Sequence, residues 1–227
     1  MSGCVVITGA SGAVGTAVVR ALAPHETLAL LDRRSAPRHE LPGAARYAGY
    51  AGIDLADDVA ADAVFARVRG ELGPVRALVH TAGAFTGGTE VKDQSAGALR
   101  HMLEANLISA ANAVRAVLPD LLAAQDGRIV LFGSAHALRG RAGASAYAAA
   151  KAGLLRFAEA LGEEVNGHGV SVVVLLPTII DTPENRAAMP GARVADWVTP
   201  EQIAATVAFL VGPGAAGIRF AAIPLGR

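Results

Sequence analysis

The fold is decided by the stretch Cys4-Val5-Val6-Ile7-Thr8-Gly9-Ala10-Ser11-Gly12-Ala13-Val14-Gly15 near the amino terminus. Its first five residues are mostly apolar and β-branched, which is typical of a buried strand. Valines, alanines and Leu22 then follow at helical spacing. The glycines between the two patterns allow a tight turn and let the backbone approach a pyrophosphate at the helix amino terminus. Because the spacing is G-x-x-G-x-x-G and not G-x-G-x-x-G, a merely tight turn remains the alternative.

The alternation of strand and helix patterns continues along the chain. Apolar runs predict further strands at 27–31, 45–50, 75–80, 128–132, 170–176 and 218–223. Helical spacing predicts helices at 59–72, 95–123 and 147–165, and a capping-box pattern at Thr199 and Gln202 predicts another. Strands that are apolar throughout are buried on both faces. We therefore expect an α/β fold with a doubly wound, Rossmann-like parallel sheet, a single domain over residues 1–227, and a short lid loop at 178–198.

Composition excludes several classes of protein. Hydrophobic residues make up 52% of the chain, so a disordered chain is excluded, and a net charge of +0 gives no basic field for nucleic acid. The purest apolar stretch, 170–177, is far shorter than the ~20 residues of a membrane-spanning helix. Cys4 is the sole cysteine, which excludes intrachain disulfides and cysteine-based zinc sites. No signal-peptide pattern is found, so we expect a cytoplasmic protein without a metal site.

The residues at the end of the second predicted strand are candidates for binding the adenosine ribose of a nucleotide. Asp32 ends that strand, where a carboxylate can accept hydrogen bonds from adenosine ribose hydroxyls and repel a 2′-phosphate. This favours NAD(H). Arg33 and Arg34 follow directly, and guanidinium groups bind phosphate well, so NADP(H) is the alternative.

A second group of residues points to proton transfer. Tyr147 and Lys151 are four residues apart on a predicted helix and share one face. A lysine ammonium near a phenol lowers the pKa of the phenol toward neutrality, which suits proton exchange with a carbonyl or hydroxyl. Ser134 follows a predicted strand at its carboxyl end, where open α/β sheets bind their ligands.

Taken together, these residues resemble the short-chain dehydrogenase/reductase family over essentially the whole chain. The resemblance rests on Thr8-Gly9-x-x-Gly12-x-x-Gly15, Asp54-Leu55, His80-Thr81-Ala82-Gly83, Asn106, Ser134 and Tyr147-x-x-x-Lys151. It implies a catalytic tetrad in which Tyr147 exchanges the proton, Ser134 steadies the substrate oxygen, Lys151 holds the nicotinamide ribose, and Asn106 supports a water-linked proton path. The predicted cofactor contacts are Gly9, Ser11, Gly12, Val14, Gly15, Asp32, Arg33, Asp54, Leu55, Ala82, Gly83, Tyr147, Lys151, Pro177, Ile180 and Thr182.

The sequence also departs from the family pattern, and one departure concerns the fourth strand. Family members usually carry asparagine where this chain has His80 and Thr81, and we interpret His80 as structural. A closer resemblance is to quinoid dihydropteridine reductase and its bacterial relatives, carried by residues 176–183, Asn185-Arg186, Met189-Pro190 and Trp197. The pteridine enzyme does not use a serine at the place of Ser134, so the likeness is one of subgroup.

The predicted function is hydride transfer between NAD(P)(H) and a small-molecule carbonyl or alcohol. Substrate-pocket candidates on the loops are Phe85, His136, Met189 and Trp197, although Met189 and Trp197 have the alternative role of pinning the lid. The resemblance implies a homodimer or homotetramer. Pteridine reduction and a non-catalytic NAD(P)-sensing or scaffold role are the rival hypotheses.

Overall fold

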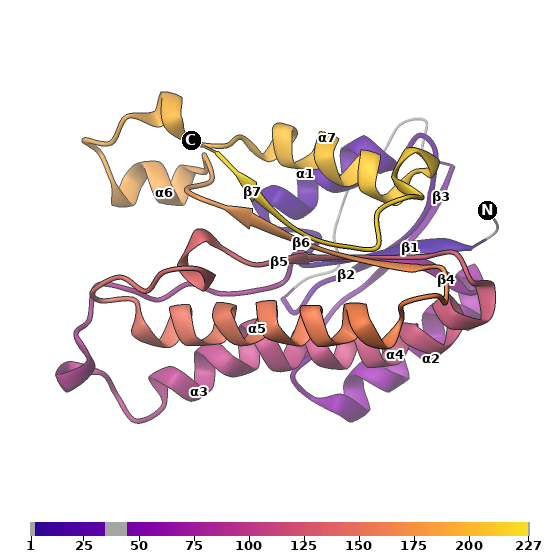
Figure 1. The fold of residues 1–227 in the computed structure, drawn as a ribbon, viewed down its shortest axis with the longest axis horizontal. Helices are drawn as coiled ribbons and strands as arrows, with labels where there is room; N and C mark the ends of the chain where they lie inside the picture. Colours follow the sequence, from indigo (N-terminus) through magenta and orange to yellow (C-terminus); the bar gives the residue numbers. More distant parts are fainter. Residues whose placement is uncertain (1–2, 35–44, 227) are drawn as a thin grey trace.

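A computed structural model describes residues 3–34 and 45–226, which build one seven-stranded sheet (Figure 1). All neighbouring strands are parallel, in the order β3-β2-β1-β4-β5-β6-β7. Their bounds are β1 Cys4–Thr8, β2 Thr27–Leu31, β3 Arg46–Tyr50, β4 Val75–His80, β5 Gly127–Phe132, β6 Val170–Pro177 and β7 Phe220–Leu225. The predicted doubly wound parallel sheet is confirmed.

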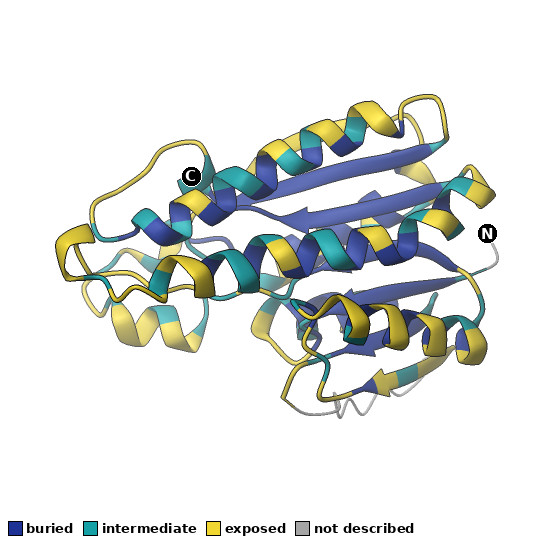
Figure 2. Ribbon diagram, turned by 90° about the horizontal axis from the view of Figure 1, so that it is seen from below, coloured by how far each residue is buried: buried dark blue, intermediate teal, exposed yellow. Residues whose placement is uncertain are grey.

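Helices cover both faces of the sheet (Figure 1). One face carries α1 Ala13–Leu22 and α7 Pro200–Val211, and the other carries α2 Asp58–Leu72, α3 Ala98–Leu103, α4 Ser109–Ala124 and α5 Ser145–Glu164. Figure 2 shows the central strands buried throughout and the outer surfaces of the helices exposed. Each face of the sheet therefore contributes to its own hydrophobic core, as buried strands without polar alternation require.

The order of the strands places a crevice beside β1. From β1 the chain extends the sheet through β2 to β3 on one side, and it then returns to β4 on the other side of β1. Loops that leave the carboxyl ends of β1 and β4 diverge at such a reversal, which is where open α/β sheets bind ligands. The glycine turn lies at this position.

The helix predicted at 95–123 begins later and is interrupted. It comprises α3, a π-helical turn at Glu104–Ile108, and α4. Together these span Ala98–Ala124, and by length and mean hydropathy (1.4) this helix is apolar enough to cross a membrane. In the structure its buried residues, Ala110, Val114 and Val117 among them, belong to the core beneath the sheet. It is therefore a core helix of this domain.

Two boundaries near the carboxyl terminus differ from the prediction. The segment predicted as an irregular lid contains the helix α6 Pro183–Ala188, because Thr182 caps it by accepting the Asn185 N–H over 3.2 Å. The last strand runs to Leu225, two residues beyond the predicted end. β7 is an edge strand, which tolerates Pro224 because one row of its backbone groups has no partner strand to bond.

Candidate active site

The glycine turn after β1 is shaped by close backbone contacts. Gly9 has a φ of +65°, a left-handed conformation that favours glycine. A Cβ at Gly9 would lie 2.8 Å from the backbone nitrogen of Ala82, and one at Gly15 would lie 2.2 Å from the carbonyl oxygen of Gly9. The turn is closed by the Gly12 N–H, which donates to that same carbonyl over 3.0 Å. Larger residues at Gly9 and Gly15 are therefore excluded.

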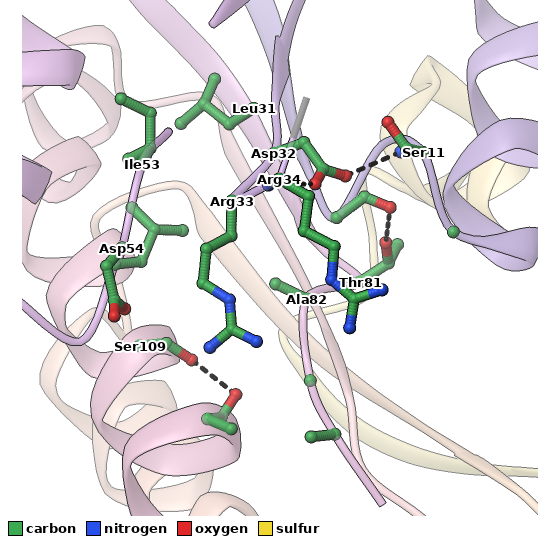
Figure 3. Close-up of a pocket in the computed structure, with 16 residues that line it drawn as sticks. Ser11, Leu31, Asp32, Arg33, Arg34, Ile53, Asp54, Thr81, Ala82 and Ser109 are labelled. Carbon is green, nitrogen blue, oxygen red and sulfur yellow. Dashed lines mark hydrogen bonds between the residues drawn. The ribbon is translucent and has the colours of Figure 1, made fainter. Parts of the chain in front are cut away.

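This turn forms one wall of a cleft of about 390 Å³ at the carboxyl ends of β1 to β4 (Figure 3). The cleft brings together the predicted cofactor contacts Gly9, Ser11, Gly12, Asp32, Arg33, Asp54, Leu55, Ala82 and Gly83. It is also lined by residues that sequence reasoning missed, namely Leu31, Ile53, Thr81, Ala84, Ala105 and Ser109. Most of these adjoin a predicted contact in sequence, and Ser109 lies about one helical turn after Asn106.

Other predicted contacts lie outside the lining of this cleft. Gly15 is buried under the turn, where its lack of a side chain lets α1 approach Gly9, so its role here is in packing. Val14 and Ile180 pack against the core on the α1 side of the sheet. Pro177, Ile180 and Thr182 follow one another at the end of β6, and Thr182 caps α6. Their predicted contacts with the carboxamide stay a prediction.

The acidic and basic side chains after β2 occupy the cleft together (Figure 3). Asp32 accepts the backbone N–H of Ser11 through one oxygen (3.0 Å) and that of Arg34 through the other (3.1 Å). The side chains of Arg33 and Arg34 both extend into the cleft, and that of Arg33 lies between Asp54 and Ala82. The wall therefore offers carboxylates and guanidinium groups within one pocket.

Ser134 and Tyr147 meet at the carboxyl end of β5. Ser134 is buried and precedes a short 3₁₀ turn at Ala135–Ala137, whose His136 backbone N–H donates to the Ser134 hydroxyl oxygen over 3.2 Å. Burial raises the pKa of Tyr147, which lies in the first turn of α5, and a hydrogen bond with Ser134 offsets part of that rise. The His136 ring packs edge-on against Tyr147, with 5.7 Å between ring centroids. The predicted serine and tyrosine are thus brought together.

Lys151 lies behind Tyr147, but its effect differs from the prediction. Its Nζ donates to the carbonyl oxygen of Phe132 over 2.6 Å and lies 5.7 Å from the centroid of the Tyr147 ring. Burial lowers the pKa of Lys151 to about 8. For Tyr147, burial is the largest cause and raises the pKa, and Lys151 is not among the causes. The pKa of the phenol is therefore raised and not lowered as expected, because burial of Tyr147 outweighs any effect of the ammonium.

Asn106 sits in the π-helical turn. Its side-chain nitrogen donates to the carbonyl oxygens of Ala84 (2.9 Å) and Met102 (3.0 Å), and its oxygen accepts the Ala84 N–H over 3.2 Å. The amide thereby ties the loop after β4 to the helix. A Cβ at Gly83 would lie 2.8 Å from Asn106 Oδ1 and 3.6 Å from Lys151 Nζ. Because Gly83 lines the cleft, the cleft adjoins both predicted catalytic residues.

His80 has the structural environment that its interpretation expects. Its Nδ1 lies 3.0 Å from the Thr8 hydroxyl and its Nε2 lies 3.4 Å from the Ser109 hydroxyl. Burial above all, and then the charge of Lys151, lower the pKa of His80 to about 3, so the imidazole is neutral. Thr81, the other departure from the family, donates through its hydroxyl to the Thr8 carbonyl over 2.7 Å and holds the turn after β4.

The four predicted substrate-pocket residues divide into two pairs. Phe85 lies edge-on to Tyr147, with 4.9 Å between ring centroids, and His136 contacts the same ring. Trp197 is buried and lines a separate hollow of about 320 Å³ with Val198, Gln202 and other residues near α7 and β7. This placement agrees with the alternative, in which Trp197 pins the lid. Met189 follows α6 on that segment and is half-buried.

The residues of the cleft fit a dinucleotide. The glycine turn presents backbone against open space at the start of α1, and the carboxylate and guanidinium groups after β2 suit ribose hydroxyls and phosphates. A Cβ at Gly9 would collide with the backbone of Ala82, so only glycine lets these two backbone segments lie this close beside a pyrophosphate. Within residues 3–34 and 45–226, no three His, Cys, Asp or Glu side chains are grouped to hold a metal ion.

Comparisons with known proteins agree with this geometry. The 3-oxoacyl-(acyl-carrier-protein) reductase FabG of Escherichia coli (strain K12) is 30% identical, and the match covers 93% of this chain and 91% of that protein. The ketoacyl reductase HetN of Nostoc sp. is 29% identical over 89% of this chain and 73% of its own length. Among solved structures, levodione reductase shares the fold with a TM-score of 0.89 at 23% identity, covering 99% of this chain and 96% of that one.

A family model settles the classification. The model of the short-chain dehydrogenases matches residues 3–192, which includes the glycine turn, the cleft and the Ser134–Tyr147–Lys151 cluster. The chain thus belongs to the short-chain dehydrogenase family and is an NAD(P)-dependent oxidoreductase that acts on carbonyl or alcohol groups.

Proposed function

We propose that this enzyme reduces a ketone carbonyl to a secondary alcohol and that its substrates are 3-oxoacyl compounds. The observation that carries the proposal is the cluster in which Ser134 is hydrogen-bonded to Tyr147 with Lys151 behind it, next to the Gly83 wall of the cleft. Bound NAD(P)H supplies a hydride to the carbonyl carbon. Tyr147 donates its phenolic proton to the carbonyl oxygen, which Ser134 holds by a hydrogen bond.

The substrate class is supported by apolar side chains beside this cluster. Phe85 is 63% exposed although it packs on Tyr147, and Leu138 is 62% exposed just after the turn that carries His136. An exposed aromatic ring against the proton donor suits the acyl part of a substrate, since burying apolar surface is favourable. The names of FabG and HetN as oxoacyl and ketoacyl reductases support the same class.

For the cofactor we propose NAD(H), with NADP(H) accepted less well. Asp32 keeps further lone pairs for ribose hydroxyls while it accepts two backbone N–H groups. The negative charge of Asp32 repels a 2′-phosphate. The positive charges of Arg33 and Arg34 weaken this repulsion without cancelling it. Fluorescence titration with NADH and NADPH measures the two affinities directly.

The assay is reduction of acetoacetyl-CoA, followed by the absorbance of NADH or NADPH at saturating cofactor. We expect turnover by the wild type, a loss of at least about 100-fold in kcat for Tyr147→Phe, and a large loss for Ser134→Ala. Ser95→Ala, an exposed serine outside the cluster, is the matched control. Turnover unaffected by Ser134→Ala would favour pteridine-type chemistry, and tight cofactor binding without reduction of any ketone would favour a sensor.

We also propose that the enzyme is a cytoplasmic homo-oligomer. The helix Ala98–Ala124 has a mean hydropathy of 1.4, yet only 39% of its most apolar window is buried within the chain. Leu99 and Ile108 are 47% and 40% exposed on this helix. A second copy that packs on the exposed side of this helix would cover apolar surface of this kind, and most soluble homo-oligomers form through closed, symmetric contacts. Sedimentation equilibrium distinguishes monomer, dimer and tetramer.

A further inference from the structure

The hydroxyl of Ser134 has a second partner besides Tyr147, and that partner is His136. The Nδ1 atom of His136 lies 3.2 Å from Ser134 Oγ, and the backbone N–H of His136 donates to the same oxygen over 3.2 Å. Both atoms therefore compete for a hydroxyl with one proton and two lone pairs. The backbone N–H occupies one lone pair, so a single proton and a single lone pair remain for His136, Tyr147 and the substrate.

The proton on Nδ1 decides how these are shared. When Nδ1 is unprotonated, it accepts the Ser134 O–H, and Ser134 then offers a lone pair to the substrate oxygen. When Nδ1 carries a proton, it donates to Ser134, and the Ser134 O–H is left to donate to the substrate oxygen. In both directions of the reaction Tyr147 exchanges the one proton of the reacting oxygen, and negative charge develops on that oxygen in the transition state. A Ser134 O–H that points to this oxygen stabilises the charge, so the state in which Nδ1 carries a proton supports the reaction in both directions.

We propose that His136 is a positioning residue that sets whether Ser134 acts as donor or acceptor, so that protonation of His136 leaves the Ser134 O–H free to donate to the reacting oxygen and speeds the reaction in both directions. This inference rests on the proposed function of Ser134. His136 acts through Ser134 and by its edge-on contact with Tyr147, which fixes the plane of its ring.

The surroundings of His136 allow it to titrate. The side chain is half-buried in the turn after β5. Burial, and then the charge of Arg141 in the following loop, lower its pKa below the ordinary 6.5. On α5, which packs against this turn, the titratable groups of the amino-terminal half are Tyr147 and Lys151; Arg156, Glu159, Glu163 and Glu164 lie further along the helix, and β6 carries none. Protonation therefore requires mildly acidic solution, in which Ser134 would donate to the reacting oxygen.

The first test observes His136 itself, without any substrate. In imidazole ¹⁵N NMR of the full chain, we expect a titration midpoint below 6.5 for the wild type. Ser134→Ala removes the partner of Nδ1, so it should change both the Nδ1 chemical shift and the midpoint. If Ser134→Ala leaves both unchanged, the two groups are not coupled and the proposal is overturned, whether or not the enzyme reduces any ketone.

The second test compares the pH profiles of variants with acetoacetyl-CoA and, in the reverse direction, 3-hydroxybutyryl-CoA. His136→Phe keeps a ring against Tyr147 but has no Nδ1, and His136→Asn retains an amide that can donate at every pH. We expect the wild-type to His136→Phe ratio of kcat/KM to rise severalfold as pH falls from 7.5 to 5.5, for reduction and for oxidation alike. His136→Asn should restore reduction without the pH dependence.

Two results distinguish failure of the inference from failure of the proposed function. Equal pH profiles of the wild type and His136→Phe in both directions would overturn the role of His136 while leaving ketone reduction intact. Absence of turnover in every variant would overturn the proposed function, and the NMR titration would then decide the coupling alone. His168→Phe, an exposed histidine remote from the cluster in sequence, is the control and should match the wild type.

Discussion

The buried ammonium of Lys151 should destabilise the fold in a way that depends on pH. Lys151 is 5% exposed, and no carboxylate within the described part of the chain forms an ion pair with it. Burial lowers its pKa from 10.5 to about 8. Each pKa unit corresponds to about 1.4 kcal/mol, so protonated Lys151 costs the folded state about 3 kcal/mol below pH 8. This cost is the consequence of holding a charged group at the carboxyl end of β5.

The sign of the effect follows from proton binding. Between the folded pKa near 8 and the unfolded value of 10.5, the unfolded chain binds more protons than the folded one. The free energy of unfolding therefore rises with pH across this window. Replacing Lys151 by methionine keeps the volume and removes the charge. The difference in free energy of unfolding, wild type minus Lys151→Met, should rise by about 2 kcal/mol between pH 7 and pH 9.5.

The assay is urea unfolding of both proteins, followed by circular dichroism at pH 7, 8, 9 and 9.5. Groups that titrate in both proteins, such as Cys4, cancel in the difference. Lys92→Met is the control, because Lys92 is 74% exposed and its pairing with Glu90 should leave the difference flat. A pH-independent difference for Lys151→Met would refute the reasoning, since it would mean that Lys151 has the same pKa in both states.

Three further changes test the turn, the cofactor wall and the π-helical turn. Gly15→Ala places a methyl group against the Gly9 carbonyl and should cost about 3 kcal/mol or more in thermal unfolding, whereas Gly70→Ala, with open space in α2, should stabilise by about 0.5–1 kcal/mol. Asp32→Ala should raise the affinity for NADPH relative to NADH by about tenfold in fluorescence titrations, and an unchanged ratio would move that role to the arginines. Asn106→Ala removes the amide that bonds to the N–H and carbonyl of Ala84, so the free energy of unfolding in urea should fall by about 2–3 kcal/mol. The kcat should fall as well. An unchanged free energy of unfolding would show that water replaces the amide.

The fold was predictable because its signals are local. Apolar runs without alternation identify buried parallel strands, and the glycine turn identifies the first crossover. α6 was missed although its cap, Thr182, is local; other boundaries that failed depend on distant contacts. The π-helical turn is stabilised by Asn106, whose amide reaches Ala84 across 22 residues, and no local pattern encodes that contact. Likewise, the isolated bridge between Ile180 and Val198 that closes the lid segment joins residues eighteen apart.

The site was predictable to the same degree. Ser134 was identified because it follows a strand at its carboxyl end, where such sheets bind ligands, and Tyr147 because it lies four residues before Lys151 on one face of a predicted helix. The prediction that Lys151 lowers the pKa of Tyr147 failed because helical spacing shows only that the two side chains are near each other, not which group Lys151 bonds to. Lys151 bonds to Phe132 on a neighbouring strand, and burial of Tyr147 outweighs any effect of that ammonium. The sequence does not predict the contact between His136 and Ser134, since two residues separated by one other in a turn have no fixed side-chain orientation.

The cluster at the end of β5 is held by backbone carbonyls and hydroxyls, and not by ion pairs. Lys151 bonds to a carbonyl, Asn106 to two, and Ser134 to an N–H and an imidazole. Neutral partners leave the charge of Lys151 uncompensated on the side of Gly83, which lines the cleft. A bound polar group that accepts a hydrogen bond from this ammonium would offset part of the free energy that its burial costs. Binding at the cleft should therefore stabilise the fold and raise the pKa of Lys151 together.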